Sequence, residues 1–298
     1  MNNKKDIRYF LANLIIILLW ASAFAGIRVG LEDFSPGQLV FLRLLFASLG
    51  LFLFVQIRRI KFPEWKDLPI IFLSGLLGFV FYHAGVSYGE TSVSAGEASL
   101  LVSTTPIFTA ILASGFFSER MGLLGWIGSI VGFIGVAIIS IGTDGNFTFN
   151  IGALFILLAS LSESVFFVFQ IPLIKKYGVV AFTTYAIWAA TLFSLVFLPG
   201  TFSAAANANI HSILSIMYLG FFPTIIPYLA LAYVTSRFGA SEATSSLYLT
   251  PTLAFVIAWI WLGEVPAWLT IIGGTITLLG VFLSSLSFPA SSKGPQTD

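Results

Sequence analysis

Glu163 is the residue whose type and position most strongly suggest chemistry in this sequence. It lies near the middle of a long apolar run over residues 151–173. An ionised carboxylate in such surroundings is costly unless it is paired, hydrated or protonated. We therefore expect Glu163 to bind a substrate ammonium group or to exchange a proton; the alternative is a protonated acid that ties two helices together. Its polar neighbours are Ser160, Ser162, Ser164 and Gln170.

Arg43 is the second charge embedded in an apolar run, which covers residues 36–57. It could neutralise a substrate carboxylate. The favoured interpretation is a scaffold residue that snorkels toward the exterior or bonds to carbonyl groups at a helix end.

Aromatic and polar side chains recur at helical spacing further along the chain. Phe79, Tyr82, His83 and Val86 follow the spacing i, i+3, i+4, i+7, which places them on one face of a helix. His83 on this face could respond to pH, or it could hydrogen-bond to a neighbouring helix. Three tyrosines of the second half, expected to serve in packing and in cavity lining, are Tyr228, Tyr233 and Tyr248.

The composition excludes several kinds of site. The chain has no cysteine and only two histidines, so disulfides, thiolate nucleophiles and a zinc site are not expected. Its 14 Lys and Arg nearly balance 13 Asp and Glu, which leaves no basic field for nucleic acid. There is no phosphate-binding glycine loop, serine elbow or acidic metal cluster, and no cofactor is expected.

The elements that must position these residues are membrane-spanning helices. Hydrophobic residues make up 57% of the chain and charged residues 9%, which excludes a soluble globular protein. Apolar runs of about 20 residues are long enough to cross a bilayer. The sequence therefore predicts an all-α integral membrane protein with ten transmembrane helices and no soluble domain. The expected spans are 11–30, 36–57, 68–87, 95–117, 122–142, 151–173, 180–199, 213–235, 240–262 and 266–287.

Basic residues predict the orientation, because positively charged loops stay on the cytoplasmic side. With the N-terminus inside, 12 of the 14 basic residues fall in interior segments, Arg28 lies outside and Arg43 in the membrane. An even number of spans returns the C-terminus to the cytoplasm. Residues 1–10 are expected to be a cytoplasmic N-terminus leading into a retained first helix, and residues 288–298 a disordered cytoplasmic tail.

An internal repeat relates the two halves of the chain at an offset of 145 residues. Each unit would contain five spans, and because five is odd the second copy must enter the membrane in the opposite sense. This predicts two inverted repeats, residues 11–142 and 151–287. The aligned pairs include Thr105 with Thr250, Pro106 with Pro251, Glu97 with Glu242, Glu119 with Glu264, and Gly128 with Gly273.

Pro106 and Pro251 fall near the middle of equivalent spans. Proline lacks an N–H and frees a carbonyl group of the preceding turn, which needs a partner in hydrocarbon. Because inverted repeats can exchange between outward-facing and inward-facing states, we expect a gating or cavity-lining role. A proline kink that only helps two helices to pack is the alternative.

Other acids and glycines have expected structural roles. Glu97 lies in a first helical turn, where the helix dipole favours an acid, whereas Glu264 follows a helix and suggests a specific partner on another helix. Gly128, Gly132 and Gly135 permit close helix approach, so a packing seam is expected rather than a dimer motif.

Several of these motifs together resemble the EamA domain of the drug/metabolite transporter superfamily. They are the sequence Leu-Trp-Ala-Ser-Ala-Phe at residues 19–24, the turn at residues 35–36 leading to Arg43, and the stretch from residue 95 through Thr105-Pro106 to Glu119. Residues 243–264 repeat the last pattern. The resemblance covers residues 10–287 as two tandem repeats.

The resemblance implies a ten-helix carrier with a central cavity walled by the first, third and fourth helices of each half. Most such carriers export amino acids, other metabolites or toxic compounds across inner membranes. Substrate contacts are expected from Trp20, Phe79, Tyr82, His83, Ser103, Glu163, Phe167, Tyr228 and Tyr248.

The resulting hypothesis is a secondary exporter of amino acids or related amphipathic solutes that works by alternating access. Proton coupling through Glu163 or His83 is left open, as is the choice between monomer and homodimer. Expected partners are a small-molecule substrate and the lipid bilayer. A multidrug efflux carrier of the same superfamily is the alternative; an intramembrane lipid-modifying enzyme lacks a convergent catalytic set, and no enzymatic activity is expected.

Overall fold

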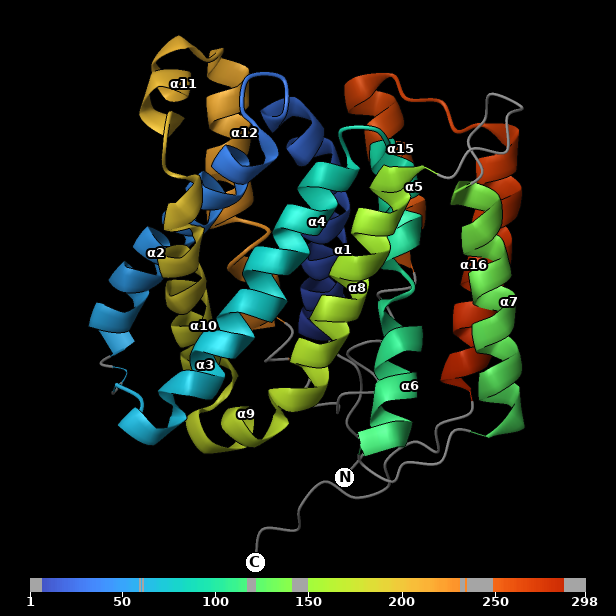
Figure 1. Ribbon diagram of the computed structural model, residues 1–298, viewed down its shortest axis with the longest axis horizontal. Helices are drawn as coiled ribbons and strands as arrows, with labels where there is room; N and C mark the ends of the chain where they lie inside the picture. Colours follow the sequence, from blue (N-terminus) through green and yellow to red (C-terminus); the bar gives the residue numbers. More distant parts are fainter. Residues whose placement is uncertain are drawn as a thin grey trace, which may run out of the picture.

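The computed structural model is helical throughout the part of the chain it describes, residues 7–58, 60, 62–116, 122–140, 150–230, 234 and 249–286 (Figure 1). Within these residues eight helical segments are long and apolar enough to cross a membrane, and two apolar helices, Thr250–Leu262 and Trp268–Ser284, are shorter. The expected all-helical membrane class is confirmed. The count of ten crossings stays a prediction. The eight segments are Ile7–Gly30, Pro36–Gln56, Trp65–Gly89, Ala95–Phe116, Leu123–Ser140, Ile151–Phe169, Val179–Phe197 and Ile210–Ala230.

The first half of the chain contains eight α-, 3₁₀- and π-helical elements before its last helix. They are α1 (Ile7–Gly30), α2 (Pro36–Arg58), the 3₁₀-helix η1 (Trp65–Asp67), α3 (Leu68–Gly75), the π-helix η2 (Leu76–Phe81), α4 (Tyr82–Gly89), α5 (Ala95–Val102) and α6 (Thr105–Phe116), followed by α7 (Leu123–Ser140).

The second half begins with α8 and includes shorter helices between the long ones. Its elements are α8 (Ile151–Phe169), α9 (Ile171–Tyr177), α10 (Val179–Ser194), the 3₁₀-helix η3 (Leu195–Phe197), α11 (Thr201–Asn207), α12 (Ile210–Phe221), α15 (Thr250–Leu262) and α16 (Trp268–Ser285). Tyr233, Glu242 and Tyr248 of the sequence predictions, and Glu119 of the first half, lie outside the described residues.

Local capping explains where several of these helices begin. Ser94 and Glu97 form a reciprocal capping box at the start of α5, so the expected role of Glu97 at the helix N-terminus is confirmed. Asn150 accepts a hydrogen bond from the Gly152 N–H at the start of α8.

The third span of each half departs from a regular α-helix, and we call these two departures interruptions. Residues 65–89 still form one helical segment, which agrees with the span expected over 68–87, whereas a turn divides the span expected over 213–235. In the first half the chain passes from α3 through the π-helix η2 into α4. In the second half α12 ends at Phe221, residues 222–225 form a turn and the helix resumes at 226. The offset of 145 maps this turn onto residues 77–80, inside η2. Pro223 accounts for the turn, since it cannot donate to the helix ladder.

The fourth span is also broken, so the helix expected over 95–117 is two helices. α5 ends at Val102 and α6 begins at Thr105, with Pro106 as its second residue. A proline is favoured in the first turn of a helix and disfavoured inside one, which explains why a new helix starts here. The equivalent Pro251 likewise occupies the second position of α15.

The sixth span is shorter than expected. α8 ends at Phe169, and Ile171–Tyr177 form the separate helix α9, with Pro172 in its first turn. Glu163 therefore lies in the last third of α8, which corrects its expected position near the middle of a span over 151–173.

Contacts at one end of the molecule show the relative direction of the helices. The Ala95 N–H, at the start of α5, donates to Glu264 just after the end of α15 (2.9 Å). Arg28 near the end of α1 forms an ion pair with the same carboxylate (3.3 Å). Asn150, at the start of α8, donates to the Ser92 carbonyl just before α5 (2.9 Å). Hence α8 runs opposite to α1, and α15 runs opposite to α5.

A glycine-lined seam joins α7 to α16, which lie side by side at one edge of the molecule (Figure 1). A Cβ at Gly128 would lie 2.7 Å from the Gly280 carbonyl oxygen, and one at Gly135 would lie 2.5 Å from the Gly273 carbonyl oxygen. The expected packing seam is present. Gly128 and Gly273, and likewise Gly135 and Gly280, are related by the offset of 145, so each half contributes the same two positions.

Candidate functional site

Three consecutive residues of α8 contact both interruptions of the first half. The Ser162 hydroxyl donates to the Leu77 carbonyl in the π-helix η2 (2.8 Å). The Ser164 hydroxyl donates to the Thr105 carbonyl at the start of α6 (2.9 Å). Between them, the Glu163 carboxylate accepts a hydrogen bond from the Thr105 hydroxyl (3.2 Å). We call these five residues the central junction.

The central junction ties α8 to the irregular backbone of the first half. Irregular backbone at membrane depth is tolerated only against protein or water. The serines of α8 supply a protein partner there, and π-helical turns are frequent at functional sites. The Thr105 carbonyl also accepts a hydrogen bond from the Thr109 hydroxyl (2.8 Å).

Glu163 keeps one carboxylate oxygen available at the central junction. Its side chain is buried, with 9% exposed, and Thr105 provides the one hydrogen bond to it within the described residues. A carboxylate with an unused oxygen in a buried site can accept an ammonium group or bind a proton.

The first helix makes the corresponding bond in the second half. The Trp20 indole N–H of α1 donates to the Pro223 carbonyl in the interrupted third span (3.2 Å). α1 thus contacts residues 222–225 as α8 contacts η2. The equivalent helices meet equivalent interruptions, although one uses an indole and the other a hydroxyl.

Aromatic rings extend from this contact across the interior. The Trp20 and Tyr228 ring centroids are 5.8 Å apart, and Tyr228 lies 5.8 Å from Phe79. Phe79 lies 6.1 Å from His83, which lies 5.1 Å from Tyr82. We call these five residues the aromatic row. It joins α1 and the helix after residue 225 to the adjoining elements η2 and α4 of the third span.

Arg43 of α2 lies beside the aromatic row and is only 4% exposed. Its Nε donates to the Thr224 hydroxyl (2.9 Å), and that hydroxyl donates to the Leu219 carbonyl (2.8 Å). The guanidinium therefore supports the turn after α12 rather than snorkelling to the exterior.

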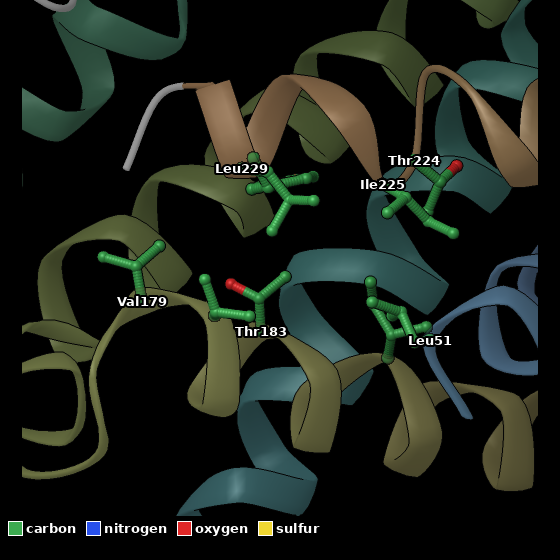
Figure 2. A pocket seen from close by; sticks show the side chains of 9 residues that line it. Leu51, Val179, Thr183, Thr224, Ile225 and Leu229 are labelled. Carbon is green, nitrogen blue, oxygen red and sulfur yellow. The ribbon is translucent and has the colours of Figure 1, made fainter. Parts of the chain in front are cut away.

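A narrow, mostly apolar cavity lies on the other side of Thr224, between α2, α10 and the helix after residue 225. Ile225 and Leu229 face Thr183 across it (Figure 2). This space adjoins the turn that Arg43 supports. Its lining is Leu51, Val179, Val180, Thr183, Ile187, Thr224, Ile225, Tyr228 and Leu229.

The remaining candidates of the sequence prediction lie around the same centre. The Ser103 hydroxyl donates to the Leu100 carbonyl at the break between α5 and α6 (2.6 Å). Phe167 packs on Phe166, which packs on Phe79. Pro106 is exposed and Pro251 is buried. Their roles in substrate contact and gating stay predictions.

The sequence prediction missed the π-helix and two threonines, Thr105 and Thr224. Each threonine is next to a proline of an interrupted span, Pro106 or Pro223. A hydroxyl beside a proline inside an apolar run is the signal that could have identified them, because the freed backbone needs a polar partner.

Charged residues gather at the two ends of the helices. At the end where α9 lies (Figure 1), Lys176 binds Glu64 (2.8 Å) and Asp67 (2.6 Å). The hydrogen bonds that Glu64 receives from Lys176 and from Lys66 lower the pKa of Glu64. At the other end, Glu264 binds Arg28 and the Ala95 N–H, which confirms its expected partner on another helix.

Comparisons with known proteins agree with the resemblance that the sequence motifs carry. The model of the EamA-like transporter family matches residues 7–141 and 150–286. The "Uncharacterized transporter YdfC" of Bacillus subtilis (strain 168) is 50% identical over 291 residues, 97% of this chain and 95% of that protein. The "Probable terminal-alkyne amino-acid exporter" of Streptantibioticus cattleyicolor is 36% identical over 272 residues, 91% of each chain.

A solved crystal structure of a protein shares the fold. It has a TM-score of 0.63 at 17% sequence identity, and the match covers 93% of this chain and 96% of the other. At this identity the likeness concerns the fold alone.

Proposed function

We propose that this chain, which belongs to the EamA-like transporter family, exports amino acids or related amphipathic metabolites across the cytoplasmic membrane by alternating access. The family consists of transporters and the relatives are named as transporters, which indicates carriage rather than enzymatic conversion.

The observation that carries the substrate class is a buried carboxylate and a buried guanidinium, both in the interior of the helix bundle. Glu163 of α8 is 9% exposed and accepts a hydrogen bond from the Thr105 hydroxyl, and Arg43 of α2 is 4% exposed. Within the described residues, the guanidinium forms one hydrogen bond, through its Nε. An amino acid carries an ammonium and a carboxylate group, which match a carboxylate and a guanidinium. The relative from Streptantibioticus cattleyicolor, named as an amino-acid exporter, supports the same class.

The mechanism we propose needs ten crossings arranged as two inverted repeats of five. Three observations support this arrangement: the opposite directions of α1 and α8, the interruptions related by the offset of 145, and the reciprocal glycines of α7 and α16. Interrupted helices at the centre of inverted repeats suit a site that opens alternately to the two sides.

The orientation we propose follows from the basic residues, with both termini in the cytoplasm. The end that holds Lys66 and Lys176 then faces inward, and the end that holds Arg28 faces outward. Reagent labelling of single cysteines placed at Lys66 and at Glu32 in intact cells would distinguish the two sides, since the chain has no native cysteine.

A counterflow screen in proteoliposomes tests the function. Purified protein is loaded with each unlabelled amino acid in turn, and with cationic drugs as a second set, and uptake of the labelled solute is measured with and without a pH gradient. We expect trans-stimulated uptake of at least one amino acid. Stimulation by cationic drugs alone would support multidrug efflux instead, and conversion of a lipid without solute exchange would contradict carriage.

A further inference from the structure

Along one face of α4 and its C-cap residue Glu90 lie three buried polar side chains whose polar atoms neither the central junction nor the aromatic row satisfies. His83, Ser87 and Glu90 follow the spacing i, i+4, i+7, with exposed fractions of 5%, 0% and 0%. Both ring nitrogens of His83, the Ser87 hydroxyl and both carboxylate oxygens of Glu90 have no hydrogen-bond partner in the described part of the chain. We call His83, Ser87 and Glu90 the polar file. It begins at the aromatic row, because His83 belongs to both.

Five buried polar atoms without partners on one helix face call for a physical explanation. Most buried side-chain polar atoms in folded proteins have a partner, which is either protein or ordered water. Residues one helical turn apart place their side chains about 5–6 Å from each other, a gap that one water molecule can bridge with hydrogen bonds to both. A line of waters between these side chains would satisfy them, because buried water occupies polar sites with several partners.

The two ends of the polar file lie in different surroundings. At Glu90, the backbone carbonyl accepts a hydrogen bond from Arg28 Nη1 (2.6 Å). The Arg28 and Glu264 side chains that meet there are 38% and 20% exposed, so this end reaches the surface. At the other end, His83 packs against Phe79 and Tyr82, and Phe79 packs against Phe166 of α8 (5.5 Å), three residues after Glu163.

We propose that His83, Ser87 and Glu90 line a hydrated proton path between the Arg28 end of the molecule and the central junction. The proposal rests on the proposed export function and deepens it, because it assigns the coupling ion and its route. A proton from solvent binds the Glu90 carboxylate, passes through water and the Ser87 hydroxyl, and protonates the neutral imidazole of His83. The imidazolium releases it through water to the Glu163 carboxylate, so one proton moves and no other bond changes.

Each element packed around His83, Ser87 and Glu90 places a charged or titratable group near them. α2 contributes Arg43, α1 contributes Arg28, the turn after α15 contributes Glu264, and α8 contributes Glu163 beyond Tyr82. Burial raises the pKa of Glu90 well above its usual value of 4.5, and Glu264 raises it further, while Arg28 and Arg43 oppose the shift. Glu90 can therefore take up a proton at a pH where an exposed carboxyl remains ionised.

Acid-driven transport compared with counterflow tests the route. For an amino acid that exchanges in the counterflow screen, the ratio of uptake driven by a pH gradient to counterflow uptake is measured for the wild type, Ser87→Ala and Glu90→Gln. We expect the ratio to fall about tenfold in both variants, equivalent to about 1.4 kcal/mol. Ser74→Ala is the matched control, because Ser74 is a buried serine of the same span whose hydroxyl donates to its own helix at Ile70 (2.7 Å). Ratios equal to those of the wild type and Ser74→Ala would overturn the proposal.

Infrared spectroscopy of the reconstituted protein tests the path without any transported solute. The carboxyl band removed by Glu90→Gln identifies Glu90, and its shift after transfer to D₂O reports contact with water. A shift complete within seconds is expected for a hydrated path. A band that shifts only when the protein unfolds would overturn the proton path. If no solute exchanged in the counterflow screen, the export function would be overturned, and this infrared measurement would still test the path.

Discussion

The α7–α16 seam and the central junction join helices in two contrasting ways. At the seam, backbones touch: a Cβ at Gly280 would lie 2.1 Å from the Gly132 nitrogen. At the central junction, single hydroxyl groups of α8 bind interrupted backbone of η2 and α6. Close backbone contact has no alternative packing, whereas one hydroxyl–carbonyl bond contributes about 1 kcal/mol and can exchange partners. The seam is therefore suited to be a rigid frame and the junction to be the part that changes shape.

The two regions also differ in how the halves contribute. Both halves supply the same glycine positions to the seam. At the centre, by contrast, α8 presents Ser162, Glu163 and Ser164, while α1 presents Trp20 to the equivalent turn. The seam therefore keeps the symmetry of the repeat, whereas the contacts to the two interruptions use different chemical groups.

The largest effect is expected from Gly280→Val at the seam. The side chain has no space against Gly132 and Gly128, so overpacking should lower the free energy of unfolding by about 3 kcal/mol or more. Thermal unfolding in detergent measures it. Gly115→Ala is the control, because nothing lies within 4 Å of a Cβ there. Wild-type stability of Gly280→Val would show that the seam is not a rigid frame.

Glu163→Gln tests the chemistry of the central junction with little change in shape. The amide keeps an oxygen for the Thr105 hydroxyl, so the melting temperature should hardly change. Loss of the charge should lower amino-acid counterflow about tenfold, which corresponds to about 1.4 kcal/mol of binding. Glu64→Gln, at an exposed end of the molecule, serves as the control. Transport at the wild-type rate would reduce Glu163 to a scaffold residue.

Ser162→Ala should have a smaller effect on stability than Gly280→Val. It removes the hydrogen bond to the Leu77 carbonyl and leaves that oxygen in an apolar interior, which should cost about 0.6–1 kcal/mol. Ser160→Ala provides the comparison, since the Ser160 hydroxyl donates within α8 to Ile156 (3.0 Å). Chemical unfolding of both variants measures the difference, and equal stabilities would argue against support of η2 by α8.

The smallest expected effect is the pH dependence of stability that Asp33 contributes. Asp33 lies just after α1, away from the seam and the central junction. Asp33 accepts hydrogen bonds from the Ser212 hydroxyl (2.7 Å) and the Asn209 N–H (2.9 Å). These bonds lower the pKa of Asp33 below its usual value of 3.8. Its contribution to stability is therefore present above pH 3.8 and lost as the pH falls through the lower pKa of the folded state. Unfolding midpoints from pH 7 to acid, compared with Asp33→Asn, should converge at low pH; parallel curves would contradict this.

Much of the frame could be predicted from residue order. Runs of apolar residues are a property of the chain alone, and eight of the expected spans correspond to helices of membrane length. The glycines of the fifth span likewise predicted the packing seam, whereas the helix starts at Thr105 and Thr250 were not predicted, because Pro106 and Pro251 were placed near the middle of their spans. Glu163 and His83 were recognisable because charge and imidazole are rare in such runs.

The interruptions and their partners depended on tertiary structure. Whether a helix with a proline kinks, breaks or becomes π-helical depends on which groups receive its free carbonyls, and those groups belong to other helices. Ser162 and Leu77 are 85 residues apart, and Trp20 and Pro223 are 203 apart. Local sequence therefore specified that this chain forms helices that cross a membrane. Only packing decided which hydroxyl meets which open backbone, because that choice is fixed by distance in space rather than by position along the chain.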